Sequence, residues 1–141
     1  MDQFTQIIIG HEGKEKSAYQ DSLGFWTIGI GRLIDARKNA GLSDDEMVYL
    51  LNNDLEQCEI ELSHFDFWTP LDRIRQDVIV ELCFNIGLHG VLEFKQMIAS
   101  LQSKDYAAAA MHLLNSTWAK QVKVGRADNM AARLKDGVYA N

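Results

Sequence analysis

Three residues within the first 27 positions combine the side chains that a hydrolysis reaction needs. Glu12 is followed after eight residues by Asp21, and after five more by Thr27. A carboxylic acid can deliver a proton to a leaving oxygen, while a carboxylate and a hydroxyl can together hold a water molecule. Two carboxyl groups used in this way are what glycoside hydrolysis requires. The ordered combination therefore predicts Glu12, Asp21 and Thr27 as catalytic residues.

Taken alone, each carboxyl group also has a structural interpretation. Glu12 lies in the last turn of an amphipathic helix expected over residues 3–12. A glutamate at a helix end is usually solvated, whereas partial burial and the negative end of the helix dipole would keep it protonated near neutral pH. Asp21 opens a turn, where aspartate commonly accepts hydrogen bonds from its own backbone. The residues alone leave both interpretations open.

The strand expected over residues 25–31 has one face without bulky side chains after its first residue. A period of two places Trp26, Ile28 and Ile30 on one face, which is predicted to pack on the core. The other face would let an extended ligand approach the backbone, although its glycines are also explained by strand twist or a bulge. It consists of Phe25, Thr27, Gly29 and Gly31.

Helical spacing accounts for most of the remaining chain. Residues 17–31 form an expected hairpin, and a polar bridge, Asp35–Gly41, follows it. Ser43 and Glu46 form a capping box for a long helix. Asp72 is expected to cap a nearly apolar, central buried helix. The expected helices cover residues 42–65, 74–86 (ending at Gly87), 91–102, 106–115, 117–122 and 127–135.

These elements predict an α+β fold that is mainly helical, and 141 residues suit a single domain. A small N-terminal helix and hairpin lobe is expected over residues 1–41 and a helical lobe over residues 66–141. The long helix over 42–65 would connect them, with a ligand-binding cleft between the lobes.

Composition excludes several classes of protein. Hydrophobic residues make up 47% and charged residues 24%, which predicts a packed core rather than disorder. No apolar run reaches the length of a membrane helix, and Met1–Phe4 lacks the basic start of a secretory signal, so a cytoplasmic protein without stable membrane association is expected. Cys58 and Cys83 suit neither a disulfide framework nor a metal site and are assigned to the core. No metal or cofactor is predicted.

Charge is distributed unevenly. The net charge of −6 argues against nucleic acid as the main partner. It does not exclude an anionic polymer that meets only the basic C-terminal end. Bases gather there as Lys120, Lys123, Arg126, Arg133 and Lys135, whereas acids dominate the long helix as Asp44, Asp45, Glu46, Asp54, Glu56, Glu59 and Glu61.

Three segments resemble the active-site region of the T-even phage lysozyme family, glycoside hydrolase family 24. They are His11-Glu12-Gly13, Tyr19-Gln20-Asp21 and the run from Gly24 to Leu33. The likeness covers nearly the whole chain, continuing through Leu42–Leu62, Phe84–Gly87, Trp118 and Gly125–Ala127. It implies a lysozyme-like fold and a muramidase that cuts peptidoglycan between N-acetylmuramic acid and N-acetylglucosamine, with inversion, in host cell lysis.

The resemblance also implies roles for individual residues. Glu12 would be the proton donor, while Asp21 and Thr27 would position the attacking water or stabilise the sugar cation. Arg126 is similar to the family arginine that pairs with the catalytic glutamate. Asn85 suits a helix-end role as well as a sugar contact. Substrate binding is expected from Phe25, Gly29, Gly31, Arg32, Asn85 and Arg126.

The sequence departs from the family pattern in the residue at position 32, which changes an expected ion pair, and in the length of the bridge after the hairpin. Arg32 stands where the family commonly has histidine, and Asp54 aligns opposite it, so an Arg32–Asp54 pair is expected. The Asp35–Gly41 bridge is shorter than the family's, which bears on the range of substrates.

The expected partner is peptidoglycan, and the protein is expected to be a monomer. It would reach the wall after release from the host bacterial cytoplasm through a separate holin-type pore. Two alternatives stay open at this point. One is a non-catalytic wall-binding or virion structural module, and the other is a lytic transglycosylase.

Overall fold

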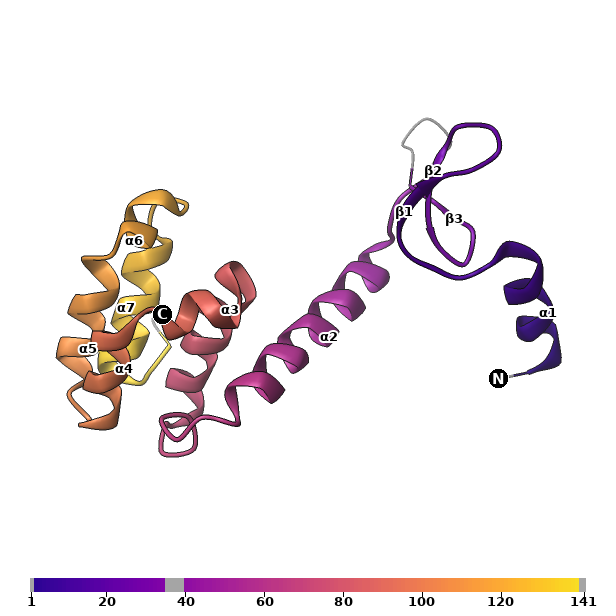
Figure 1. Cartoon of the computed structure of the whole chain (residues 1–141). Coiled ribbons are helices and arrows are strands. Elements are labelled where there is room, and N and C mark those ends of the chain that lie inside the picture. Colours follow the sequence, from indigo (N-terminus) through magenta and orange to yellow (C-terminus); the bar gives the residue numbers. More distant parts are fainter. Residues whose placement is uncertain (1, 35–39, 140–141) are drawn as a thin grey trace. The chain divides into compact units, whose positions relative to one another are not determined.

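The computed structural model describes residues 2–34 and 40–139, so most of the expected 35–41 bridge lies outside the described residues. The chain forms two compact units, Met1–Leu50 and Leu51–Asn141, and the helix α2 runs through the division. The described residues form helices and one small antiparallel sheet, which confirms the predicted, mainly helical α+β fold (Figure 1). The elements are α1 (Gln3–Glu12), β1 (Glu15–Gln20), β2 (Trp26–Gly29), β3 (Arg32–Leu33), α2 (Asp44–Leu62), α3 (Arg73–Leu92), α4 (Lys95–Gln102), α5 (Tyr106–Leu114), α6 (Thr117–Gln121) and α7 (Arg126–Asp136).

Helix α1 has well-defined ends. The Asp2 side chain accepts a hydrogen bond from the Thr5 N–H at 2.8 Å and caps the first turn. Gly13 ends the helix with a φ of 79°, and its N–H donates to the carbonyl of Ile9 at 2.9 Å. The predicted helix over residues 3–12 is confirmed, with Glu12 as its last residue.

The sheet has the order β1-β2-β3, so the predicted hairpin is confirmed and a short third strand is added to it. Thr27 lies on the central strand, opposite Tyr19 on one side and Leu33 on the other. Gly29 and Gly31 both adopt positive φ, 70° and 68°, in the tight connection from β2 to β3. Glycine adopts this conformation without the strain that a side chain would add.

The prediction that Trp26 and Ile30 pack on the core is wrong. Trp26 is 49% exposed and Ile30 41%, whereas Thr27 on the opposite face is only 4% exposed. A period of two establishes which residues share a face but not which face is covered. Ile30 also lies in the glycine-flanked turn rather than on the strand, so the alternation does not extend to it.

The caps of the two longest helices are confirmed. Ser43 Oγ accepts from the Glu46 N–H at 3.2 Å, and Glu46 Oε1 accepts from the Ser43 N–H at 2.9 Å. Asp72 accepts from the Arg75 N–H at 3.2 Å. Helix α3 breaks at Gly87 (φ 81°, ψ 165°) as expected, but helical turns then resume to Leu92.

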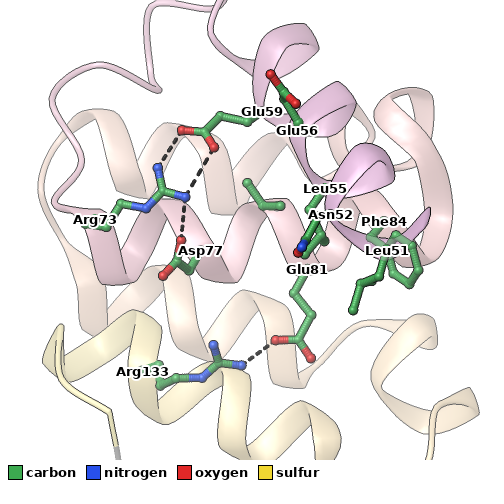
Figure 2. A pocket seen from close by; sticks show the side chains of 11 residues that line it. Leu51, Asn52, Leu55, Glu56, Glu59, Arg73, Asp77, Glu81, Phe84 and Arg133 are labelled. Carbon is green, nitrogen blue, oxygen red and sulfur yellow. Dashed lines mark hydrogen bonds and ion pairs between the residues drawn. The ribbon is translucent and has the colours of Figure 1, made fainter. Parts of the chain in front are cut away.

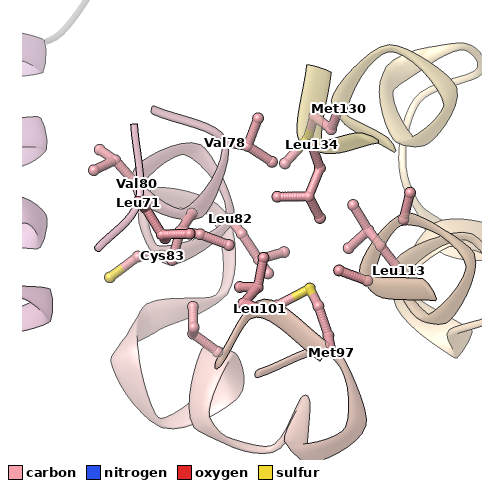
Figure 3. Packing of buried hydrophobic residues seen from close by; sticks show 14 of the residues in the cluster. Leu71, Val78, Val80, Leu82, Cys83, Met97, Leu101, Leu113, Met130 and Leu134 are labelled. Carbon is pink, nitrogen blue, oxygen red and sulfur yellow. The ribbon is translucent and has the colours of Figure 1, made fainter. Parts of the chain in front are cut away.

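The core lies in the C-terminal unit. In Figure 3, apolar side chains from α3, α4, α5 and α7 point toward one another, and α3 supplies more of the buried cluster than any other helix, as expected for a central helix. Cys83 is buried and Cys58 packs against the same cluster, both as free thiols, which confirms their assignment. Burial, with a smaller contribution from Cys58, raises the pKa of the Cys83 thiol to about 12. Among the described helices, none combines the length and apolarity needed to cross a membrane.

Candidate active site

Glu12, Asp21 and Thr27 all belong to the N-terminal unit. They lie at the end of α1, at the start of the turn between β1 and β2, and on β2. These are the helix end, turn and strand that the sequence predicts for them.

The Glu12 carboxyl group lies against the backbone of Gly31. A Cβ atom at Gly31 would stand 2.6 Å from Glu12 Oε2, 3.0 Å from Cδ and 3.2 Å from Cγ, so any side chain there would displace the carboxyl group. Gly31 thus serves two purposes, because its φ of 68° also favours glycine. The expected partial burial of Glu12 is not observed, since its side chain is exposed. Open access suits a group that must reach a large substrate.

Asp21 holds its turn with one carboxylate oxygen. Oδ1 accepts from the N–H groups of Leu23 and Phe25, each at 2.9 Å. The Asp21 N–H donates to the Phe25 carbonyl at 2.8 Å, and Gly24 donates to the Asp21 carbonyl at 2.9 Å. The structural role of Asp21 is therefore real. Its second oxygen, Oδ2, has no hydrogen-bond partner among the described residues and can accept a further hydrogen bond.

The Thr27 hydroxyl is buried beside the same turn. Thr27 Oγ1 donates to the carbonyl of Phe25 at 3.1 Å. A hydroxyl that donates in this direction keeps its lone pairs for an incoming donor, such as a water molecule. The Phe25 carbonyl thus accepts a hydrogen bond from Thr27 Oγ1, and the Phe25 N–H donates one to Asp21 Oδ1. One residue ties the two candidate water-holding groups together.

Arg32 pairs with Glu46, so the expected pair with Asp54 is wrong. The two guanidinium nitrogens lie 2.8 Å and 2.6 Å from the two oxygens of Glu46, and one also donates to the Gly41 carbonyl at 3.1 Å. Glu46 stands in the first turn of α2, where its capping bond to Ser43 already holds the carboxylate in place. The Arg32 hydrogen bond, followed by the Ser43 backbone, lowers the pKa of Glu46 from 4.5 to about 2.

Two other predicted residues lie in the C-terminal unit with partners of their own. Asn85 Oδ1 accepts from the indole N–H of Trp118 at 2.8 Å, which supports a structural role for the amide oxygen. Arg126 Nε donates to Glu81 Oε1 at 3.3 Å. Trp118 itself is buried.

A pocket of about 540 Å³ opens between α2, α3 and α7 (Figure 2). Ion pairs of Arg73 with Glu59 and Asp77, and of Arg133 with Glu81, border it. None of the predicted catalytic residues lines it. Glu81 was missed by the sequence reasoning because its partners lie 45 and 52 residues farther along the chain. No three His, Cys, Asp or Glu side chains in the part of the chain that the structure describes are placed to hold a metal ion.

Comparison with known families places this site in a wider context. A family model described as phage lysozyme matches residues 9–135. The chain belongs to the phage lysozyme family. As a phage lysozyme it is a glycoside hydrolase of the muramidase type, which confirms the class of enzyme expected from the sequence.

Individual relatives of this phage lysozyme have modest identity. The probable T4-type lysozyme 1 of Dictyostelium discoideum is 28% identical over 137 residues, covering 78% of this chain and 81% of the relative. The endolysin of Salmonella phage P22 is 32% identical over 104 residues, covering 70% of each. The pre-baseplate central spike protein Gp5 of Enterobacteria phage T4 is 26% identical over an alignment 159 residues long. The alignment covers 94% of this chain but 28% of that protein.

Proposed function

We propose that this phage lysozyme hydrolyses the β-1,4 bond between N-acetylmuramic acid and N-acetylglucosamine in peptidoglycan, with inversion at the anomeric carbon. The observation that carries the proposal is the arrangement in the N-terminal unit. An exposed Glu12 carboxyl lies against Gly31, and Asp21 and Thr27 are tied to each other through the backbone of Phe25.

Glu12 acts as the general acid. It delivers its proton to the glycosidic oxygen as the bond from that oxygen to the anomeric carbon breaks, so that the leaving sugar departs as a neutral alcohol. Helix α1 fixes the backbone position of Glu12, and the lack of a side chain at Gly31 leaves space for the carboxyl group. A misplaced acid would lose much of this effect, because proton transfer requires hydrogen-bond distance.

Asp21 and Thr27 hold and activate the attacking water. The water donates one hydrogen to a lone pair of Thr27 Oγ1 and the other to Asp21 Oδ2. Its oxygen bonds to the anomeric carbon on the face opposite the leaving group, and Asp21 takes up the proton. A nucleophilic aspartate would gain little from a neighbour whose use is to orient water, which favours inversion.

The proposed sugar contacts follow from exposure and free hydrogen-bonding groups. Gly29 has open space where a side chain would stand, so a glycan can approach its backbone beside Phe25 and Gly31. Asn85 keeps its amide N–H groups for a sugar oxygen, because only Oδ1 binds Trp118. Arg32 would bind a sugar with the side of its guanidinium group that faces away from Glu46, since Glu46 holds both terminal nitrogens.

The biological setting that we propose is host cell lysis by a monomer. The relative named endolysin supports a role in lysis. In this setting the protein would reach the wall from the host cytoplasm, with a separate holin-type pore for release. The spike protein relative is the reason to keep a virion-associated role as the competing setting.

Mass spectrometry of fragments released from purified sacculi tests the proposed reaction. Hydrolysis leaves a reducing N-acetylmuramic acid at each new end. A lytic transglycosylase would instead leave a 1,6-anhydro sugar, lighter by one water molecule, and a binding module would release no fragments. We expect reducing ends only; either other result overturns the proposal.

A further inference from the structure

Cys58 of α2 and Cys83 of α3 face each other, although 24 residues separate them in the sequence. Cys58 packs against the apolar cluster to which Cys83 belongs, and its side chain is a hydrogen-bond partner of the Cys83 thiol. In Figure 3 the Cys83 sulfur points away from the side chains of α5 and α7. The sequence contains no other cysteine, so the fold brings the two thiols of the chain together.

The segments of α2 and α3 that carry the two thiols are joined by further contacts. Glu59, the residue after Cys58, pairs with Arg73 at the start of α3, with 2.5 Å between Oε1 and a terminal nitrogen. Leu55 and Val80, each one turn before one of the cysteines, line the same pocket. All of these residues belong to the compact C-terminal unit. The neighbourhood of the two thiols is therefore a property of this unit.

The two thiols differ in their access to solvent. Cys83 is 2% exposed, whereas Cys58 is partly exposed. A thiol attacks as the thiolate, and burial raises the pKa of Cys83. A reagent from solvent therefore meets Cys58 first, and Cys83 lies behind it as a second thiol. An accessible thiol beside a resolving thiol is an arrangement found in cysteines that respond to oxidation.

We propose that Cys58 and Cys83 form a disulfide bond when the chain meets a disulfide donor, and that the bond fastens α2 to α3. In a bacterial cytoplasm both thiols stay reduced, because the thiol pools of that compartment keep disulfides rare. In the proposed setting of host cell lysis the lysozyme leaves the cytoplasm, so the bond forms after release; this timing rests on the proposed function. Both helices pack without the bond, which adds to a core that is already formed.

The reaction is thiol–disulfide exchange in two steps. The Cys58 thiolate attacks one sulfur of the donor, the S–S bond of the donor breaks, and the other half leaves as a thiolate that takes up a proton. The Cys83 thiolate then attacks Sγ of Cys58, and the remaining half of the donor leaves in the same way. The two protein thiols are oxidised, and one donor disulfide is reduced to two thiols.

Oxidised glutathione is the donor in a test on the purified full chain. We expect mass spectrometry of unreduced peptides to show Cys58 linked to Cys83 within one chain, with both free thiols lost. The Tm of the oxidised chain should exceed that of the reduced chain by about 5–10 °C, on the usual scale for a disulfide. Added reductant should abolish this difference in Tm.

Two single variants separate the two steps. Cys83→Ala should stop at the mixed disulfide of Cys58 with glutathione, because the resolving thiol is absent. Cys58→Ala is the matched variant, and its buried Cys83 should stay reduced. Neither should show the rise in Tm. Cys58→Ala changes the more exposed position and still provides the comparison if Cys83→Ala does not fold. Modification of Cys83 in Cys58→Ala as fast as in the parent would overturn the assignment of Cys58 as the first thiol.

The parent chain itself decides the inference. It is overturned if that chain ends with glutathione on Cys58, links only to other chains, or keeps both thiols. A bond that forms but leaves the Tm unchanged or lowers it also overturns the inference, because cysteines placed for a disulfide need no distortion of the folded chain. No peptidoglycan enters this experiment, so its failure leaves the proposed reaction intact. Release of fragments from sacculi tests that reaction separately.

Discussion

Replacing Gly31 with alanine would place a methyl group where the Glu12 carboxyl group now lies. The new Cβ would stand 2.6 Å from Oε2, whereas ordinary contacts begin at about 3.4 Å. The carboxyl must therefore retreat by about 0.8 Å, since it is the flexible end of a side chain and the Gly31 backbone is not. The expected effect on activity is large, because a misplacement of about 1 Å can cost about 100-fold in rate.

The same substitution should cost little stability. A side chain at a φ of 68° costs about 1–2 kcal/mol, partly offset by the lower entropy of alanine in the unfolded chain. A net loss of about 1 kcal/mol lowers the Tm of a chain of this size by about 3 °C. Gly31→Ala is therefore expected to be folded at the assay temperature, with activity lost far beyond any loss of folded protein.

Rates of fragment release and melting curves, measured side by side, provide the assay. Gly87→Ala is the control, because Gly87 also has a positive φ, 81°, but nothing within 4 Å of the position of a Cβ. It should lose at least as much stability, because its φ and ψ of 81° and 165° are essentially restricted to glycine, and keep its activity. The reasoning is refuted if Gly31→Ala retains activity within twofold of the parent while its Tm falls as much as that of Gly87→Ala.

Three further variants test other parts of the account. Glu12→Gln should lower the rate of lysis at least about 100-fold with an unchanged Tm, because an amide cannot supply the proton, and near-normal lysis would remove Glu12 from the mechanism. Arg32→Gln should lower the Tm above pH 5, and the difference in Tm from the parent should disappear as pH falls toward 2. The reason is that the pair lowers the pKa of Glu46 to about 2, so its stabilisation is lost as that carboxylate protonates. A difference in Tm that persists at pH 2 would contradict this. Lys120→Glu with Lys123→Glu should slow lysis more at low than at high ionic strength, since both lysines are exposed and salt screens long-range attraction to the wall. Equal slowing at both ionic strengths would indicate that the lysines act locally.

Local chemistry made much of the fold predictable from the sequence. The capping box at Ser43 and the cap at Asp72 involve residues three apart, and both have the predicted hydrogen bonds. The break at Gly87 likewise follows from the residue type. The burial of Trp26 and Ile30 could not be predicted, because alternation carries no information on which face the rest of the unit covers. Trp26 was judged by its hydrophobicity alone.

Contacts between distant positions were the least predictable part of the site. The bare strand face indicated a close approach at Gly31, but the group that the structure brings there is the Glu12 carboxyl, nineteen positions earlier. The partner of Arg32 was assigned by alignment, whereas the nearer Glu46 was already held by its capping bond. The role of Glu81 in joining two arginines of α7 has no local pattern from which it could be read.

The most direct test of the central claim is the configuration of the first product. Proton NMR during the first turnovers on a soluble peptidoglycan glycan shows which anomer of the new reducing end forms before mutarotation. Attack by a water held between Asp21 and Thr27 predicts the α-anomer from the β-linked substrate. The β-anomer as first product, or a glycosyl adduct trapped on Asp21, would contradict the account and make Asp21 the nucleophile.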